Sequence, residues 1–224
     1  MSGGDHVHPA ATRQGKARVG ILISGAGSNM AAIIEAAKAA DYPAEIAVVV
    51  SNNPEADGLA LARAAGVQAL AIDHRPFGKD RHAHELAIDS ALRTHGVEVV
   101  VLAGYMRILT AHLVRAWEGR MLNIHPSLLP KYPGLDTHAR AIAAGDAEAG
   151  CTVHLVTEGV DEGPVLGQAR VPVEAGDTPE TLAARVRVAE HRLYPEALAA
   201  FIRQRKTAPV LNRRRFPSEG LSDA

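Results

Sequence analysis

A strand, a glycine loop and a helix at the start of the chain constrain its fold most. Residues 18–24 (RVGILIS) are mostly β-branched or leucine, and the loop GAGSN then leads into the alanine-rich segment MAAIIEAAKAA. This order is typical of the first unit of an α/β fold. Its loop collects backbone N–H groups at the positive end of the helix dipole, which suits a phosphate. Taken alone, the loop is a weak signal, and the alternative is a simple tight turn.

The same unit argues against a nicotinamide cofactor. The dinucleotide-binding fingerprint has a third glycine where this chain has Met30, and an acidic residue after the second strand, where it has Ser51, Asn52 and Asn53. We therefore expect no NAD.

The rest of the chain alternates strand and helix patterns. The run 97–103 is nearly all apolar, which is typical of a central parallel strand buried on both faces. The pattern predicts a doubly wound, mostly parallel twisted sheet of Rossmann-like type, with helices on both faces. Strands are expected at 44–50 and 67–72, helices at 56–65, 81–94, 138–144 and 178–203, and a strand pair on either side of the turn DEGP. Pro195 predicts that the last helix bends or is two helices.

Charge and length limit the partners and the domain count. Twenty-four basic residues against 25 acidic ones predict no partnership with nucleic acid or a membrane, and the single Cys151 excludes an internal disulfide and a cysteine-based zinc site. Residues 1–17 lack the apolar core of a signal peptide, and no apolar run approaches about 18 residues, so we expect a cytoplasmic protein. One catalytic domain is expected at 18–203, with polar, mobile tails at 1–17 and 204–224.

The segment 121–138 (MLNIHPSLLPKYPGLDTH) holds the main candidates for chemistry. Its prolines restrict the backbone around Asn123 and His125, which are two positions apart and so share one face if the chain there is extended. One supplies amide donors and the other a titratable proton. The alternative is a turn with a hydrogen-bonded, non-catalytic histidine. The motif HELAI at 84–88 lacks the second histidine of a zinc-protease site.

Four motifs, ILISGAGSN, LAGYMRIL, LNIHPSLLPKYPG and DEGPV, appear in this order, and with them the chain from about residue 18 to 201 resembles the phosphoribosylglycinamide formyltransferase family, a family of folate-dependent enzymes. The resemblance implies formyl transfer from 10-formyltetrahydrofolate, a co-substrate, to the primary amine of glycinamide ribonucleotide in de novo purine biosynthesis. It implies no metal. A homodimer is left open.

The resemblance also implies roles for individual residues. The catalytic residues would be Asn123, His125 and Asp161, and the ribonucleotide would contact Gly27, Ser28, Asn29, Arg187 and Glu190. The folate would contact Arg81, Met106, Arg107, Ile108, Leu109, Asn123, Val156, Thr157, Glu158, Gly159 and Val160. The Leu129–Pro130 bond would be cis. The chain departs from some relatives at Asp136, where they have histidine, and at Glu162, where they have glycine.

These residue types fit the implied chemistry. Formyl transfer passes through a tetrahedral intermediate whose oxygen gains negative charge, and the Asn123 amide and a protonated His125 can stabilise it. His125 can also deliver a proton to the leaving nitrogen, directly or through a water positioned by Asp161. We expect His154 to support this group or to be a core histidine with its hydrogen bonds satisfied.

Three other functions remain as alternatives. A formyltetrahydrofolate hydrolase would be expected to carry a regulatory domain before the first strand, and a methionyl-tRNA formyltransferase to carry a tRNA-binding domain after the last helix. A non-catalytic nucleotide- or folate-binding module would keep the glycine loop but would not need Asn123, His125 and Asp161 together.

Overall fold

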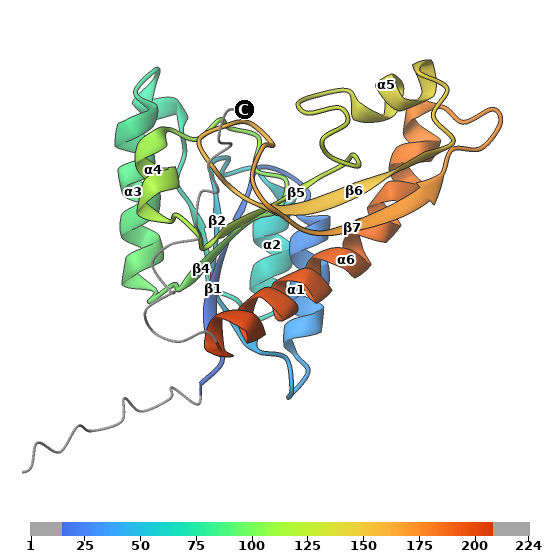
Figure 1. The fold of residues 1–224 in the computed structure, drawn as a ribbon. Helices are drawn as coiled ribbons and strands as arrows, with labels where there is room; N and C mark the ends of the chain where they lie inside the picture. The colour runs from blue at the N-terminus through green and yellow to red at the C-terminus, as the bar shows by residue number, and fades with distance from the viewer. Residues whose placement is uncertain (1–14, 208–224) are drawn as a thin grey trace, which may run out of the picture.

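The computed structural model describes residues 15–207, which form a seven-stranded sheet with helices on both faces (Figure 1). The strand order is β3, β2, β1, β4, β5, β6, β7. The first five strands are parallel, whereas β6 is antiparallel to both β5 and β7. The strands are β1 (Ala17–Ile23), β2 (Ala44–Ser51), β3 (Ala69–Ala71), β4 (Val99–Leu102), β5 (Met121–His125), β6 (Glu148–Leu155) and β7 (Val165–Pro172). The predicted mostly parallel, doubly wound fold is confirmed.

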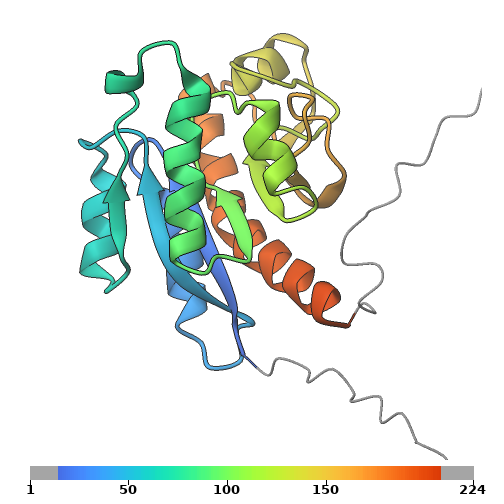
Figure 2. The ribbon, with the colours of Figure 1, turned by 90° about the vertical axis from the view of Figure 1, so that its left-hand side faces the viewer.

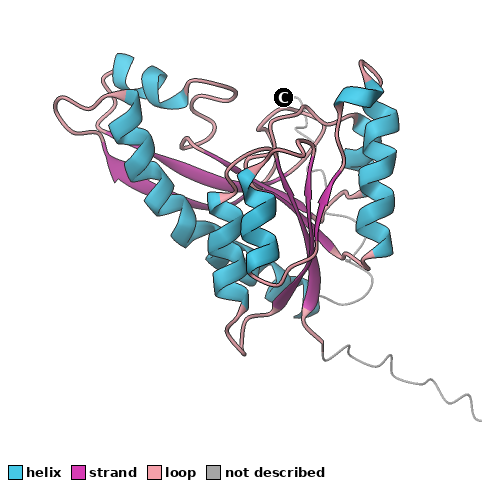
Figure 3. Cartoon of the chain, turned by 180° about the vertical axis from the view of Figure 1, so that it is seen from behind, coloured by secondary structure: helices cyan, strands magenta, loops and turns pink. Residues whose placement is uncertain are grey.

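Helices cover the sheet in two layers. Helices α1 (Ser28–Ala37), α2 (Asp57–Ala64) and α6 (Pro179–Thr207) pack on one face, and α3 (Arg81–Thr94) and α4 (Ala111–Ala116) pack on the other, as the view in Figure 2 shows. A short 3₁₀ helix, η1 (Arg75–Phe77), precedes α3. Helix α5 (Thr137–Ala143) lies beside the part of β6 and β7 that extends past the other strands (Figure 3).

The two layers explain why the central strands are so apolar. Along β4, Val99 and Val101 face the core beneath α1, α2 and α6, whereas Val100 and Leu102 face the core beneath α3 and α4. Successive side chains of a strand point to opposite faces, so a strand covered on both sides is apolar at every position.

The last helix was expected to bend at Pro195 or to be divided there into two helices. A single helix, α6, runs through Pro195, so the two-helix alternative is wrong. Proline removes one backbone hydrogen bond, but residues on both sides of it, among them Val186, Tyr194 and Phe201, are buried in the same core and hold the helix together. Helix α6 also continues to Thr207, past the expected end at 203.

Most other elements differ from their expected bounds by a few residues. Helix α3 is an exception with the expected bounds, and Asp80 caps it by accepting a 2.9 Å hydrogen bond from the Ala83 amide. Strand β3 is only three residues long, and β1 starts at Ala17. Most of the two expected tails, 1–17 and 204–224, lies outside the described residues, at 1–14 and 208–224, whereas Ala17 begins β1 and residues 204–207 belong to α6. Within residues 15–207, no helix is long and apolar enough to cross a membrane.

Candidate active site

The expected catalytic residues meet beside the end of β5. Asn123 and His125 both lie on this strand, and Asp161 lies in the turn between β6 and β7. The Asp161 Oδ2 atom is 3.3 Å from Nδ1 of His125, and both side chains are largely buried, with 11% and 7% exposed. His154 faces Asn123 across the β5–β6 pair. Four polar side chains from two neighbouring strands and a turn therefore form one cluster.

The second nitrogen of His125 fixes the orientation of its ring. Nε2 lies 2.9 Å from the carbonyl oxygen of Tyr132. A carbonyl can only accept a hydrogen bond, so Nε2 carries a proton and donates it. The nitrogen that can gain or lose a proton is therefore Nδ1, the atom that faces Asp161.

His154 orients the Asn123 amide. Its Nδ1 donates to the Leu155 carbonyl at 2.9 Å, and its Nε2 lies 3.2 Å from Nδ2 of Asn123 and 3.7 Å from Oδ1 of Asp161. Burial lowers the pKa of His154, although the Leu155 carbonyl and Asp161 act in the other direction. A neutral ring leaves Nε2 as an acceptor for one Asn123 N–H, and the other N–H of that amide remains available to a ligand.

The proline-rich loop is held in place by several hydrogen bonds. The Leu129–Pro130 bond is cis. Thr152 accepts from the Leu129 amide at 3.0 Å and donates to the Ser127 carbonyl at 2.7 Å. Further along, the Gly134 amide donates to Oδ2 of Asp161 at 2.9 Å. This loop therefore fixes both His125 and Asp161.

The residues expected at the ribonucleotide gather where α1 starts beside α6. Gly27 has a left-handed φ of 70° directly before α1, and a Cβ there would lie 3.0 Å from the Cα of Gly58. Asn29 donates a 2.7 Å hydrogen bond to Glu190 on α6. Burial raises the pKa of Glu190, and the Asn29 hydrogen bond, Arg187 and His125 oppose that rise. The residues expected at the ribonucleotide therefore lie close enough to His125 for its charge to act on Glu190.

The residues expected at the folate lie on two loops and the start of α3. In the loop after β4, the Met106 and Ile108 side chains are 71% and 67% exposed, and Arg81 reaches the Ile108 carbonyl at 3.5 Å. Leu109 and Val156 pack against the same core, so the second loop, 156–160, starts beside the first. The remaining members of the second loop include Val160, which is 57% exposed, and Glu158, which pairs with Arg115 at 2.6 Å.

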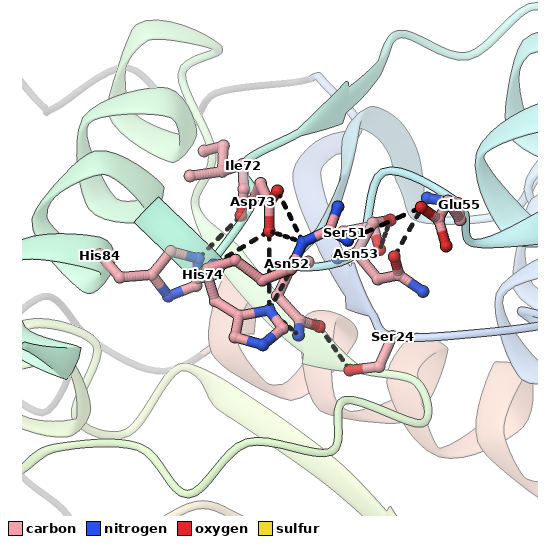
Figure 4. A network of polar contacts seen from close by, with 10 residues as sticks. Ser24, Ser51, Asn52, Asn53, Glu55, Ile72, Asp73, His74 and His84 are labelled. Carbon is pink, nitrogen blue, oxygen red and sulfur yellow. Dashed lines mark hydrogen bonds and ion pairs between the residues drawn. The ribbon is translucent and has the colours of Figure 1, made fainter. Parts of the chain in front are cut away.

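A polar network that was not expected from the sequence supports the first of these loops (Figure 4). The Ser24 hydroxyl accepts a 2.8 Å hydrogen bond from the Met106 amide and donates to Oδ1 of Asn52 at 2.6 Å. Asn52 in turn contacts His74, whose Nδ1 donates to the Asn52 carbonyl at 2.9 Å. At the other end of the loop, buried Glu85 accepts from both the amide and the hydroxyl of Thr110.

The two departures from the relatives' pattern leave the central cluster intact. Asp136 precedes α5 with a left-handed φ of 56°, a conformation that aspartate tolerates better than most residues, and its side chain is exposed. Glu162 is exposed beside Gly159, where a Cβ would lie 2.2 Å from its carboxyl oxygen. Among the described residues, no three His, Cys, Asp or Glu side chains are grouped to hold a metal ion. The absence of a metal stays a prediction.

The chain is similar to known formyltransferases over most of the described residues. The sequence profile described as "Formyl transferase" matches residues 17–198. Phosphoribosylglycinamide formyltransferase of Escherichia coli K12 is 43% identical over 206 residues, which cover 90% of this chain and 97% of that protein. The structure of phosphoribosylglycinamide formyltransferase from Brucella melitensis matches with a TM-score of 0.80 and 57% identity, over 84% of this chain and 96% of that one.

A longer relative matches only in part. The trifunctional purine biosynthetic protein adenosine-3 of Bos taurus is 47% identical over 183 residues, which cover 82% of this chain. The matched region is 18% of the length of that protein.

Proposed function

Because the chain belongs to the formyl transferase family, we propose that it transfers the formyl group of 10-formyltetrahydrofolate to the primary amine of glycinamide ribonucleotide. The products are formylglycinamide ribonucleotide and tetrahydrofolate. The observation that carries the proposal is the contact of His125 Nδ1 with Asp161, next to the oriented amide of Asn123. The name of the Escherichia coli relative, which matches over almost its whole length, supports the choice of acceptor.

The ribonucleotide is proposed to bind with its phosphate at the N-terminus of α1. Gly27, Ser28 and Asn29 form the turn there, and the free N–H groups of a helix start attract an anion. Arg187, which is exposed on α6, adds a positive charge, and Glu190 lies one turn further along that helix. The electrostatic interaction of Glu190 with His125 indicates that the amine end of the substrate would face the catalytic cluster.

The folate is proposed to bind between the loop 106–109 and the loop 156–160, with Arg81 at one side. The exposed Met106, Ile108 and Val160 side chains offer an apolar surface to an aromatic ring. Arg81 and Arg107 offer positive charge to the carboxylates of the folate. The N10 formyl group would then face Asn123.

The chemistry follows from the cluster. The substrate amine attacks the formyl carbon, a new N–C bond forms, and the bond from the formyl carbon to N10 breaks. The Asn123 N–H that is not used by His154 stabilises the oxygen of the intermediate, and the loss of one such donor costs about a hundredfold or more in rate. The amine loses a proton and N10 gains one. His125 Nδ1, with Asp161 beside it, is the group that moves this proton.

The test is a spectrophotometric assay of deformylated folate with and without glycinamide ribonucleotide. We expect turnover only when the ribonucleotide is present. Turnover without it would establish the hydrolase instead, and binding of both ligands without any turnover would establish a binding module. His125→Ala should lower kcat by about two to four powers of ten, with little change in either KM. The homodimer, the cytoplasmic location and the absence of nucleic acid or membrane partners stay predictions.

A further inference from the structure

Tyr132 contacts the central histidine through its backbone. Its carbonyl oxygen is the acceptor for His125 Nε2 at 2.9 Å, and this bond decides which ring nitrogen faces Asp161. The position of that carbonyl depends on an unusual backbone conformation, because Tyr132 has a left-handed φ of 56°. Residues other than glycine, asparagine and aspartate rarely adopt it, so the surrounding structure must hold it.

The Tyr132 side chain supplies that hold. Its hydroxyl donates a 2.8 Å hydrogen bond to Oδ2 of Asp146, which lies between α5 and β6. Lys131 binds the other oxygen of the same carboxyl at 2.8 Å, and the Arg140 guanidinium lies over the tyrosine ring at 5.1 Å from its centroid. Arg140 also donates to the Pro133 carbonyl at 2.6 Å.

Asp146 is not a member of the catalytic cluster. It makes no hydrogen bond or ion pair with His125 or Asp161 among the described residues, and its side chain reaches the proline-rich loop through Tyr132 and Lys131. Its side chain is 17% exposed. A small cavity lies between the proline-rich loop and α5, and Tyr132 and Asp146 are both in its wall. The Tyr132–Asp146 contact therefore ties the proline-rich loop to the turn between α5 and β6.

We propose that Tyr132 and Asp146 are positioning residues. Their side-chain contact holds the Tyr132 carbonyl at hydrogen-bonding distance from Nε2 of His125 and so keeps Nδ1 of that ring facing Asp161. The inference rests on the proposed function for its kinetic part, whereas the state of the His125 ring can be measured without turnover. Neither side chain needs to touch a substrate. Their loss is expected to lower kcat and to leave both KM values unchanged.

The experiment compares Tyr132→Phe, Asp146→Ala and the double variant. Tyr132→Phe removes the donor of the hydrogen bond and Asp146→Ala removes its acceptor, whereas asparagine at 146 would still accept it through its amide oxygen. A misplaced catalytic group costs up to about a hundredfold, so we expect kcat to fall by about tenfold to a hundredfold in each single variant. Both changes break the Tyr132–Asp146 contact. Asp146→Ala also removes the ion pair with Lys131, which contributes little because the lysine side chain is 58% exposed, so the double variant should lose no more than the single ones. Additive losses, or an effect on KM alone, would overturn the proposal.

Glu148→Gln is the matched control. Glu148 lines the same cavity and carries the same charge, but it pairs with Arg170 and does not contact Tyr132. It should keep kcat within about twofold, since surface ion pairs contribute little. A loss equal to that of Asp146→Ala would mean that the charge around the cavity matters, and not the hydrogen bond to Tyr132.

A second readout separates this inference from the proposed function. Nitrogen NMR of 15N-histidine-labelled protein at high pH reports which nitrogen of neutral His125 carries the proton, with His125→Gln to assign the signal. Wild-type protein should have the proton on Nε2, and Tyr132→Phe should show a mixture of both forms. If wild-type protein does not transfer formyl groups, the proposed function fails, and this measurement alone decides the inference. An unchanged proton position in Tyr132→Phe would overturn it.

Discussion

The side-chain amide of Asn29 donates a 2.7 Å hydrogen bond to Oε2 of Glu190, and this contact joins the N-terminus of α1 to the middle of α6. The other amide atom, Oδ1 of Asn29, is buried and has no hydrogen-bond partner among the described residues. A buried acceptor of this kind is costly unless a ligand satisfies it. The pair therefore both links two elements and leaves one polar atom for the ribonucleotide.

Glu190→Gln should raise the KM for glycinamide ribonucleotide by about tenfold and leave the KM for the folate nearly unchanged, since a hydrogen bond to a charged group contributes about 1.5–3 kcal/mol.

Burial raises the pKa of Glu190, so its carboxyl takes up a proton at a higher pH than an ordinary glutamate does. The ribonucleotide KM of wild-type protein should then rise as pH falls, and that of Glu190→Gln should rise less. Steady-state kinetics from pH 5 to 8 measure both. Glu196→Gln, an exposed change on the same helix, is the control. Equal acid dependence in all three proteins would contradict the role of Glu190.

Ser28→Leu tests the phosphate site at the start of α1. Ser28 is the first residue of that helix, where the free backbone N–H groups lie, and a larger side chain there should obstruct a phosphate. We expect the ribonucleotide KM to rise by tenfold or more, on the order of 1.4 kcal/mol, with the folate KM unchanged. Glu35→Leu, near the far end of the same helix, should change neither constant. If only the folate KM changed, the loop would belong to the folate site and not to the phosphate site.

The sequence predicted the fold and the closeness of Asn123 to His125. Strand and helix periodicity predicted the parallel sheet, and the spacing of Asn123 and His125 predicted that they share a face. Asp161 joins them only because the β6–β7 turn folds back onto β5, and its place came from the resemblance and not from spacing. The left-handed φ of Asp161, 58°, is a further feature that no pattern signalled.

Supporting residues were harder to predict because they depend on register and tertiary contact. The partnership of His154 with Asn123 follows from the β5–β6 register, which the sequence does not encode locally. Asp146 is in the segment AGDAEAG, which has the composition of any helix-to-strand loop, and nothing there indicates that it binds Tyr132. His84 and Glu85 of the HELAI motif are buried and hydrogen-bonded to Ile72 and Thr110, and nothing in that motif indicates these contacts.

Ser24→Ala should weaken folate binding without affecting the ribonucleotide. The change removes the acceptor of the Met106 amide and so loosens one end of the loop 106–109. A lost hydrogen bond of about 1 kcal/mol corresponds to about a fivefold rise in the folate KM. Hydrogen exchange at the Met106 amide should accelerate in the same variant. Ser90→Ala, an exposed change on α3, should leave the folate KM unchanged. If the Met106 amide exchanges faster but the folate KM does not move, the loop is not part of the folate site.

His84 predicts how stability depends on pH. This histidine is 1% exposed, its Nε2 donates a 2.8 Å hydrogen bond to the Ile72 carbonyl, and the Phe77 ring packs against it with 5.3 Å between ring centroids. Burial lowers the pKa of His84, with smaller effects from the Ile72 hydrogen bond and from Arg107 and His74. The unfolded chain, in which a histidine has a pKa of about 6.5, therefore binds a proton that the folded protein resists.

The stability that neutral His84 supports is therefore present above about pH 6.5 and is lost as pH falls toward the lowered pKa of His84 in the folded protein. Burial lowers the pKa of His154 as well, so that residue contributes in the same direction. In urea unfolding, the free energy of unfolding of wild-type protein should decrease from pH 7.5 to pH 5, and this decrease should be smaller in His84→Gln. The variant is expected to be less stable than wild type at pH 7.5, so the test is the slope and not the absolute value. His82→Gln, on the exposed side of the same helix, should keep the wild-type slope. An unchanged slope in His84→Gln would mean that acid destabilises the protein through other groups.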